Sequence, residues 1–361
     1  MAKASQQQTR MQSSSDKYWF DEAAAGKAVD FIEKFCTHVK GELGGKPFLL
    51  EDWQKNDIIR PIFGWKDADG LRRYRTCYVE IPRKNGKSNL SAAIALYMLF
   101  ADGEPGAEII SAAGDRGQAS IVFDIARDMI GNNRHLTQRS RVLRNVIKYK
   151  SSWYKSISAE AYTKHGLNCH AVIFDELHTQ PNRDLWDVLT TSTGARRQPL
   201  TMALTTAGHD RASICYEVHE YAEKVRDGII DDPTFLPVLY CADVDDDWTK
   251  EETWRKANPG YGSICHKSYF DQAVQNAKAN PSMVNSFLRL HLNIWTSAET
   301  AWIPDDIWMK GNKPIPYDLL STLPAYGGLD LASTQDLTAF ALLFRDDSND
   351  CFYLLVHQFV N

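Results

Sequence analysis

Gly86-Lys87-Ser88 is the triplet in this sequence whose residue types and position best suit phosphate chemistry. It lies between two apolar runs, within "EIPRKNGKSNLSAAIALYMLF" (80–100). A glycine-containing loop that opens a helix can bind phosphates, because backbone N–H groups at the helix N-terminus point at them and the helix dipole favours negative charge. In such a loop Lys87 would reach the β and γ phosphates and Ser88 would ligate Mg²⁺.

The loop departs from the usual GxxxxGK[ST] pattern. Ile81 stands where the first glycine is expected, and Arg83, Lys84 and Asn85 lie inside the loop. A plain helix start is therefore the alternative interpretation of the triplet taken alone.

A pair of acids follows a second apolar run. In "AVIFDELH" (171–178), four apolar residues precede Asp175 and Glu176. Carboxylates at the end of a buried strand are costly unless they have a partner or a function. In ATPases with phosphate-binding loops, one acid holds the Mg²⁺ and a second group orients the attacking water. The alternative is that the two acids cap the next helix.

Two weaker signals have the same character. "TMALTTAG" (201–208) is an apolar run that ends in Thr205 and Thr206, which could sense a γ-phosphate or simply form a turn. Gln54 stands beside Trp53, and its amide could bind the edge of an adenine. Because each candidate lies at the appropriate end of its element, the order of all four along the chain favours one nucleotide site.

These residues fall on alternating strand-like and helical runs. The sequence predicts an early helix over 21–39, strands over 76–81, 108–113, 171–174 and 201–205, and further helices over 88–100, 118–130, 185–192 and 213–227. Such alternation implies an α/β fold with a parallel sheet covered by helices on both faces.

The pattern changes after about residue 240. Helices are predicted over 269–279 and 282–295 with no buried strand between them, and a proline-spaced linker follows over 303–324. Strands are predicted over 325–331, 338–345 and 351–359, with "DDSND" as a hairpin turn. Three strands with an open edge predict the start of an incomplete domain.

Composition excludes several classes of protein. The net charge of −5 over 361 residues argues against binding a polyanion by bulk charge, so DNA would need a local basic face. Seven cysteines without a CxxC pair disfavour a zinc site or disulfide framework and favour a reducing cytoplasm. The polar residues 1–17 are predicted to be a disordered lead-in rather than a signal peptide. The longest apolar run, 92–101, is about half of a membrane span.

Several of these stretches resemble the large terminase subunits of tailed bacteriophages. The resemblance rests on "PRKNGKS", "VIFDELH", "LTTAG", "ANPGYG" and "LNIW", and it extends from about residue 46 to the end. It implies an ASCE-type P-loop NTPase domain over 18–240, a small helical lid or linker subdomain over 241–324, and the truncated start of an RNase H-like nuclease domain over 325–361. The missing glycine is then a feature of the family, whose phosphate-binding loops deviate in this way.

The resemblance also implies roles for individual residues. Lys87 and Ser88 match the phosphate and Mg²⁺ residues, Asp175 matches the Walker B acid, and Glu176 matches the catalytic glutamate. Arg83 matches a loop arginine that senses or stabilises the γ-phosphate. Thr205 and Thr206 match the motif that couples hydrolysis to movement. Gln54, Lys84, Asn85 and Gly86 complete the expected ATP-binding set.

Asp330 is the candidate for a second active site. It ends the short apolar run in "YGGLDLASTQDLTAFALLF" (326–344) and matches the first metal-binding aspartate of the RNase H-like nuclease that cuts concatemeric viral DNA. Such nucleases use several carboxylates to hold two Mg²⁺ or Mn²⁺ ions. The other acids would lie beyond residue 361, so 1–361 is expected not to cleave DNA. Asp336 is interpreted as a turn residue.

A basic stretch free of acids lies between Asp128 and Glu160. It contains Arg139, Arg141 and Arg144, which are candidates for an arginine supplied to the ATP of a neighbouring subunit. A DNA-backbone contact, which would be strongly salt-dependent, and a solvated basic face are the alternatives.

The leading interpretation is an ATP-driven motor that moves viral dsDNA into a procapsid in the host cytoplasm. The resemblance implies a ring, probably of five subunits, on the portal protein, a small terminase subunit that selects the DNA, and a monomer in isolation. Another P-loop ATPase acting on DNA, of helicase or partition type, is the first alternative. A non-hydrolysing nucleotide-binding scaffold is the second.

Overall fold

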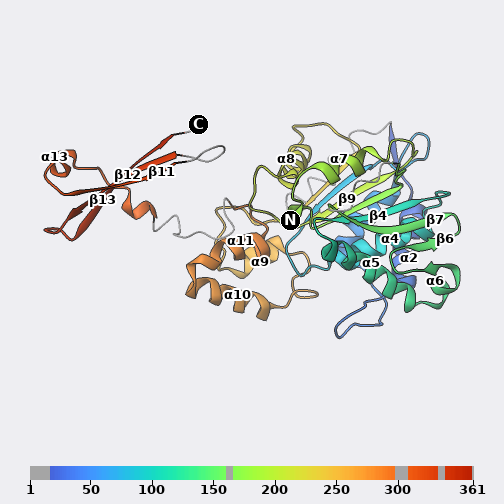
Figure 1. Ribbon diagram of the computed structural model, residues 1–361. Helices are drawn as coiled ribbons and strands as arrows, with labels where there is room; N and C mark the ends of the chain where they lie inside the picture. The colour runs from blue at the N-terminus through green and yellow to red at the C-terminus, as the bar shows by residue number, and fades with distance from the viewer. Residues whose placement is uncertain (1–16, 160–165, 297–307, 332–337, 360–361) are drawn as a thin grey trace. The chain divides into compact units, whose positions relative to one another are not determined.

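The computed structural model describes residues 17–159, 166–296, 308–331 and 338–359. Two compact units make up the chain, 1–302 and 303–361 (Figure 1). The predicted disordered lead-in lies almost wholly outside the described residues, as does Asp336. Within the described ranges, no helix combines the length and apolar character that crossing a membrane requires.

An eight-stranded sheet forms the centre of the first unit. Its strand order is β10-β3-β9-β8-β4-β7-β6-β5, and the six strands from β10 to β7 are parallel. The last two strands are antiparallel. The strands are β3 (Thr76–Glu80), β4 (Glu108–Ala113), β5 (Arg141–Val142), β6 (Ile147–Tyr149), β7 (Ser152–Ser158), β8 (Ala171–Asp175), β9 (Leu200–Thr205) and β10 (Phe235–Leu239). A separate ribbon pairs β1 (Tyr18–Phe20) with β2 (Trp65–Asp67).

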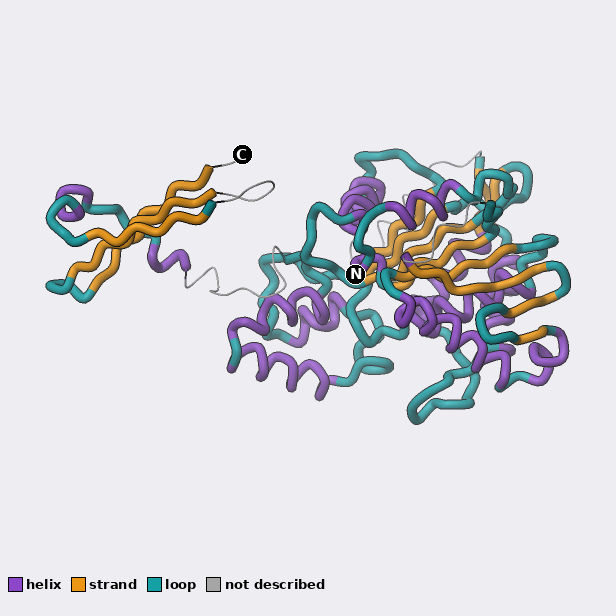
Figure 2. The backbone as a smooth tube through the Cα atoms, viewed as in Figure 1, coloured by secondary structure: helices purple, strands orange, loops and turns teal. Residues whose placement is uncertain are grey.

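Successive side chains of the central strands enter cores on opposite faces of the sheet. In β8, Ile173 belongs to one core, whereas Val172 and Phe174 belong to the other. This alternation is the two-residue period of a strand, and both faces are apolar because helices cover both. Figure 2 shows the helices on either side of the sheet.

The two faces are covered by different helices. The larger core takes side chains from α2 (Glu22–Phe35), the π-helical turn η1 (Gln54–Ile59), α3 (Arg60–Gly64), α4 (Lys87–Phe100) and α5 (Arg116–Gly131). The smaller core takes side chains from α7 (Asp184–Thr191) and α8 (Ile214–Arg226). The short helix α6 (Arg134–Arg139) follows α5, and the 3-10 turn η3 (Leu177–Thr179) follows β8.

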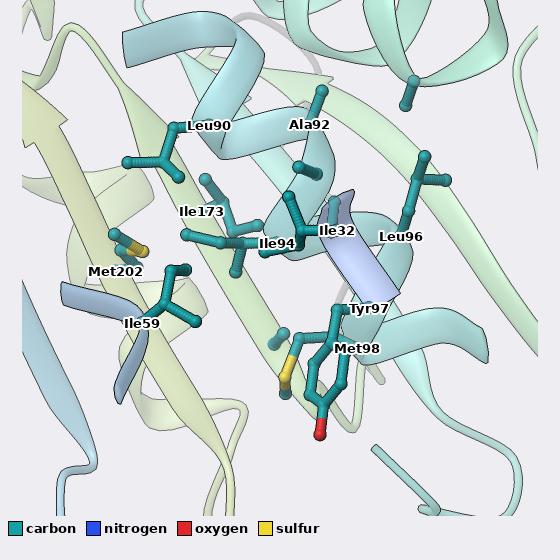
Figure 3. Close-up of a cluster of buried hydrophobic side chains, with 14 of the residues drawn as sticks. Ile32, Ile59, Leu90, Ala92, Ile94, Leu96, Tyr97, Met98, Ile173 and Met202 are labelled. Atoms are coloured by element: carbon teal, nitrogen blue, oxygen red, sulfur yellow. The ribbon is translucent and has the colours of Figure 1, made fainter. Parts of the chain in front are cut away.

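Helix α4 is the most deeply buried helix among these. Leu90, Ile94 and Leu96 are almost wholly inaccessible, and Figure 3 shows Ile94 near Ile173 of β8 and Ile32 of α2. A helix that is apolar on nearly every side can only be stable inside a protein. The phosphate-loop candidate therefore opens an element that the core holds in a fixed position.

Three helices after residue 240 pack around a core of their own. They are α9 (Glu251–Ala257), α10 (Lys267–Ala279) and α11 (Val284–Leu292), with the 3-10 turn η4 (Pro281–Met283) between the last two. Trp254 stacks on Phe270 at a centroid distance of 5.5 Å, and Phe287 belongs to the same cluster. We call α9, η4, α10, α11 and the segments that join them, residues 241–296, the helical subdomain.

The second unit contains a three-stranded antiparallel sheet. Its order is β11-β12-β13, and its strands are β11 (Ala325–Asp330), β12 (Thr338–Asp346) and β13 (Cys351–Phe359). The turns η5 (Met309–Gly311) and α13 (Tyr317–Leu320) precede it. Asp330 is the last residue of β11, as the sequence predicted.

The structure adds elements that the sequence analysis did not predict. The stretch treated as a basic segment contains β5, β6 and β7, which extend the sheet with an antiparallel edge. Strand β10 and helix α9 were also missed, and α9 begins at the end of the acidic stretch "DVDDDWTKEE" (243–252). The four predicted strands, β3, β4, β8 and β9, are all parallel, so the predicted parallel sheet is confirmed, and β6 and β5 add the antiparallel edge.

A buried ion cluster joins the amino end of β8 to the segment after α4. Asp102 lies between Arg72 and His170, whose Nε2 is 2.6 Å from Asp102 Oδ2. Burial would raise the pKa of Asp102, but Arg72 and His170 outweigh burial and hold that pKa well below its usual value. The folded state therefore favours the carboxylate.

We predict that Asp102→Asn lowers the free energy of unfolding by about 3–5 kcal/mol, because it leaves the buried Arg72 without its counter-charge. Urea unfolding followed by circular dichroism measures this change. The pKa of Asp102 is depressed in the folded state, so its contribution is complete above the unfolded value of about 3.9 and is lost as the pH falls below that value.

Asp30→Asn is the matched control. Asp30 pairs with Lys34 at 2.7 Å, but both side chains are more than 60% exposed, so its loss should cost at most about 1 kcal/mol. Equal stabilities for the two variants would show that the Asp102 cluster does not hold the fold together.

Candidate active site

The carboxyl ends of three adjacent strands bring the candidate residues together. Strands β3, β9 and β8 are neighbours and parallel, so the loops that follow them leave from one edge of the sheet. In open α/β sheets ligands bind at this edge. The Ile81 amide donates to the Thr205 carbonyl at 3.0 Å, and the Glu176 amide donates to Leu204 at 2.8 Å.

The loop from 81 to 86 has two left-handed residues. Gly86, the N-cap of α4, has φ +80°, and Lys84 has φ +69°. Ile81 is fully buried in the larger core and is not one of the left-handed residues. The backbone at position 81 therefore does not require the glycine of the usual pattern. The left-handed backbone at position 86 does favour a glycine.

Lys87 is buried at the first position of α4. Its ammonium donates to the carbonyls of Ile81 (3.0 Å) and Pro82 (3.3 Å) and lies 3.7 Å from Glu176 Oε1. Burial lowers the pKa of Lys87, against the opposing effect of Glu176 and Asp175. The lysine of the loop is thus paired with the acid that follows β8. Ser88 stands one residue further on in α4, half-buried.

Asp175 is the last residue of β8 and is 1% exposed. Neither of its carboxylate oxygens accepts a hydrogen bond from the described residues. Burial, and then the neighbouring Glu176, raise the pKa of Asp175 to about 7. A buried carboxylate with free oxygens is costly by itself and is well suited to bind a hard cation such as Mg²⁺.

The pKa of Glu176 is shifted in the direction opposite to that of Asp175. Burial would raise its pKa, but Lys87, His178 and Thr206 outweigh that effect and lower the pKa to about 2. Its backbone is left-handed, with φ +52°, which is a strained conformation for a residue other than glycine. This left-handed conformation turns the chain sharply at the end of β8. The Glu176 side chain is held ionised beside Lys87.

Thr205 ends β9 and Thr206 follows it, and the two threonines reach Glu176 directly or through His178. Thr206 Oγ1 donates to Glu176 Oε2 at 3.0 Å, and His178 Nδ1 lies 3.3 Å from the same oxygen. His178 Nδ1 is also 3.0 Å from Thr205 Oγ1. The side chains predicted to sense phosphate are therefore part of the hydrogen-bond network that holds Glu176.

Gln54 lies against the phosphate loop. The side chain is 1% exposed, its Oε1 accepts from the Glu51 amide, and its Nε2 has no acceptor among the described residues. A Cβ placed on Gly86 would be 3.8 Å from that nitrogen. An unpaired buried donor beside a phosphate loop fits the predicted contact with an adenine.

The helical subdomain supplies site residues to which the sequence analysis gave no role. Asn85 is completely buried, donates to Asn258 Oδ1 at 2.9 Å, and accepts from the Gly260 amide at 3.1 Å. Cys265 Sγ donates to the Lys84 carbonyl at 3.1 Å. The stretch "ANPGYG" (257–262) thus contacts the loop directly, and its only signal in the sequence was the family motif.

Trp295 joins the same subdomain to the segment after β9. Its Nε1 donates to the buried carboxylate of Glu80, at 3.3 and 3.2 Å from the two oxygens. Glu80 also accepts from the Tyr78 hydroxyl and binds His219 Nδ1. A Cβ on Gly208 would be 2.8 Å from the Trp295 ring, so the glycine of "LTTAG" leaves room for the indole of "LNIW".

Four predicted residues lie elsewhere. Arg139 ends α6, Arg141 begins β5, and both are exposed, as is Arg144. Because β5 is four strands from β8, it is about 19 Å from the Asp175 strand at the usual strand spacing. Asp330 belongs to the second unit, and no group of three or more acids, histidines and cysteines suited to a metal occurs in the described ranges. Arg83, in the loop, is exposed.

Comparisons with known proteins agree with this arrangement. A family model described as the ATPase domain of the terminase large subunit matches residues 52–224, and a model of its endonuclease domain matches 229–361. The terminase large subunit of Enterobacteria phage HK97 is 32% identical over 331 residues, which are 89% of this chain and 62% of that protein. Protein YmfN of Escherichia coli K12 is 31% identical over 180 residues, 50% of this chain and 40% of that protein.

The fold is also similar to a solved structure. The crystal structure of the HK97 bacteriophage large terminase superimposes with a TM-score of 0.66 at 27% identity, over 92% of this chain and 67% of that one. The chain spans less than two thirds of the length of the curated relatives named above. ATPase and endonuclease domains of this family imply the use of a nucleotide and of divalent metal.

Both parts of the chain thus match domains of one protein, and the buried lysine, acids and threonines lie together at the strand ends. This chain belongs to the large terminase subunit family of bacteriophages.

Proposed function

We propose that the chain hydrolyses ATP to translocate dsDNA into a viral procapsid. The observation that carries this proposal is the contact of a buried, ionised Glu176 with Lys87 of the phosphate loop, next to the unpaired carboxylate of Asp175. A non-hydrolysing scaffold would have no need to hold two carboxylates and an ammonium at this burial cost.

The residues of the site divide the work between binding and catalysis. Lys87, Gly86, Asn85, Lys84 and Ser88 would hold the phosphates, and Gln54 would hold the adenine. Ser88 and Asp175 would ligate Mg²⁺, which when bound neutralises phosphate charge. Glu176 would accept a hydrogen bond from the attacking water and orient it, since its low pKa keeps it ionised at neutral pH.

Thr205 and Thr206 would report the state of the γ-phosphate. Thr206 holds Glu176, and the two threonines lie at the carboxyl end of β9, the strand between β3 and β8. Arg83 is exposed in the loop, where its guanidinium is free to approach a γ-phosphate. Movement of these groups between nucleotide states would be the start of translocation.

We further propose the domain limits and partners that the family resemblance implies. Residues 18–240 form the ATPase domain, 241–324 the lid or linker subdomain, and 325–361 the first strands of an RNase H-like nuclease domain, whose Asp330 would bind Mg²⁺ or Mn²⁺ in the full-length protein. The chain assembles on the portal protein as a ring, probably of five, with a small terminase subunit, and is monomeric in isolation. It acts in the host cytoplasm. A helicase or partition-type ATPase is less consistent with the two matching family models.

We predict that Lys87→Ala and Glu176→Gln both abolish ATP turnover. Loss of Lys87 should also weaken ATP binding, whereas Glu176→Gln should bind ATP and fail to hydrolyse it, because a neutral amide polarises and orients the attacking water less well than an ionised carboxylate. A general base contributes about 10²–10⁴-fold to a rate. Steady-state phosphate release by residues 1–361 over a range of protein and dsDNA concentrations measures this.

Glu51→Gln is the control, because the Glu51 contact to Gln54 is made by its backbone amide. Turnover that survives in Glu176→Gln would remove Glu176 from the mechanism. Binding without turnover in the unmodified chain would favour the scaffold.

We predict that one of Arg139, Arg141 and Arg144 acts on the ATP of a neighbouring subunit. Arg139 and Arg141 lie at the β5 edge of the sheet, four strands from β8, which favours a role on the ATP of another subunit. Arg144 follows β5 and lies near Arg116 and Ser156 of β7. Each Arg→Ala variant lacks the arginine but keeps an intact Glu176. The Glu176→Gln variant keeps the arginine but lacks the catalytic carboxylate. Mixing the two should restore part of an activity that loss of the arginine lowers by about 10³-fold.

The readout is turnover against mixing ratio at fixed total protein. Arg134→Ala, in the first turn of α6, is the matched control. A mixture that never exceeds the activity of its components, for all three arginines, contradicts a role in trans.

A further inference from the structure

We propose that Asn293, at the end of helix α11, positions the proposed catalytic Glu176 and connects it to the phosphate loop. This inference rests on the proposed ATPase function. Asn293 contacts neither Glu176 nor the loop, so it acts through the residues between them.

The end of α11 is satisfied by donors from outside the helix. The last carbonyls of a helix have no partner within it. Here Leu290 accepts from the Arg83 amide at 2.9 Å, His291 accepts from Asn258 Nδ2 at 2.8 Å, and Leu292 accepts from the Ala242 amide at 3.0 Å. The helix end therefore cannot move away from the phosphate loop without leaving polar groups unpaired.

Asn293 extends these contacts to the segment after β9. Its Oδ1 accepts from the Ala207 amide at 2.7 Å, and its Nδ2 donates to the Tyr240 carbonyl at 3.0 Å. The side chain is 2% exposed, so water does not replace either bond. Ala207 is joined by one peptide bond to Thr206, whose hydroxyl donates to Glu176.

The two sets of contacts form one continuous path. It runs from Glu176 through Thr206 and Ala207 to Asn293, and from the end of α11 to Arg83 in the loop. Asn258 adds a parallel connection, because it donates to His291 and accepts from Asn85. A shift of the loop would therefore be transmitted to Glu176 through Thr206, which contacts Oε2, in addition to Lys87, which lies near Oε1.

The backbone at 293 explains why asparagine suits this position. Asn293 is the C-cap of α11 with φ +59°, a left-handed conformation that asparagine and glycine adopt most readily. Glycine would keep this backbone but lose both hydrogen bonds. Aspartate would keep the acceptor for Ala207, and because burial favours its protonated form, its hydroxyl can still donate to the Tyr240 carbonyl. Comparing the two substitutions therefore separates the effect of the left-handed backbone from the effect of the side-chain hydrogen bonds.

The test compares Asn293→Gly and Asn293→Asp in residues 1–361. We expect Asn293→Gly to lower kcat for ATP by about tenfold, as loss of an outer-shell partner does, and to leave KM within about threefold. Asn293→Asp should recover most of kcat. Asp350→Gly is the matched control, since Asp350 is an exposed left-handed residue of the turn between β12 and β13.

Hydrogen exchange with a non-hydrolysable ATP analogue gives a second readout that does not require turnover. In the unmodified chain the analogue should change exchange both in the loop and at 205–208. In Asn293→Gly the response of the loop should persist and the response at 205–208 should be lost. A purely structural role would not separate these two responses.

Each outcome is decisive. Equal kcat for Asn293→Gly and Asp350→Gly, with ATP turnover intact, overturns the inference and leaves the ATPase standing. An Asn293→Asp variant as impaired as Asn293→Gly also overturns it, and Asn293→Asp decides alone if the glycine variant does not fold. An unmodified chain in which the analogue protects nothing refutes nucleotide binding itself, and the inference falls with it.

Discussion

The rest of the site depends on the cost of burying Lys87, Asp175 and Glu176 together. Isolated charges of this kind cannot be removed from water unless each has a partner. Lys87 and Glu176 satisfy one another and the carbonyls and hydroxyls around them, and so the ammonium and one carboxylate are fixed. Asp175 is the group left over, and its raised pKa reflects that. A bound divalent cation would relieve this imbalance, which gives the structure a physical reason to bind Mg²⁺ at Asp175.

The position of this cluster is a consequence of strand order. Strand β9 lies between β3 and β8, so the two threonines at its carboxyl end come between the loop and the acids. The opposite ends of the strands are held by a different buried cluster, in which Asp102 pairs with Arg72 and His170. The apolar interior of the sheet thus has an ion cluster near each end. In the first the carboxylate of Asp102 is paired, which suits stability, whereas in the second the carboxylate of Asp175 has no partner among the described residues, which suits cation binding.

The sequence predicted the central elements because their signals are strong. Strands β3, β4, β8 and β9 are short apolar runs, and α4 is apolar after its first turn except for Ser91, so their bounds were found within one or two residues. Strand β10 was missed because it contains Pro237, which removes a donor. The structure tolerates that proline because β10 is an edge strand. Strands β5 to β7 were missed because their charges suggested a solvated surface.

Asn258, Asn293, Trp295 and Glu80 show a different limit. Asn258, Asn293 and Trp295 are far from the loop in sequence, and only the packing of the helical subdomain brings them to the site, whereas Glu80 ends β3 beside the loop and its partner Trp295 could not be predicted. Hydrogen bonds between buried amides leave no periodicity from which to predict them. The quoted motifs "ANPGYG" and "LNIW" marked the right segments, but their roles follow from contacts that need coordinates.

The missing glycine of the phosphate loop has a conformational explanation. A glycine is required where the backbone is left-handed or where another group approaches too closely for a Cβ. In this loop the left-handed residues are Lys84 and Gly86, while Ile81 continues from β3 into the larger core. Replacing Ile81 by glycine would remove a buried side chain and gain nothing for the turn. Lys84 accepts the strain instead, and its carbonyl is held by Cys265 of the helical subdomain. The conformation of the loop therefore depends partly on contacts with that subdomain and not only on its own glycines. For this reason the loop sequence can depart from the usual pattern while Lys87 still contacts Glu176.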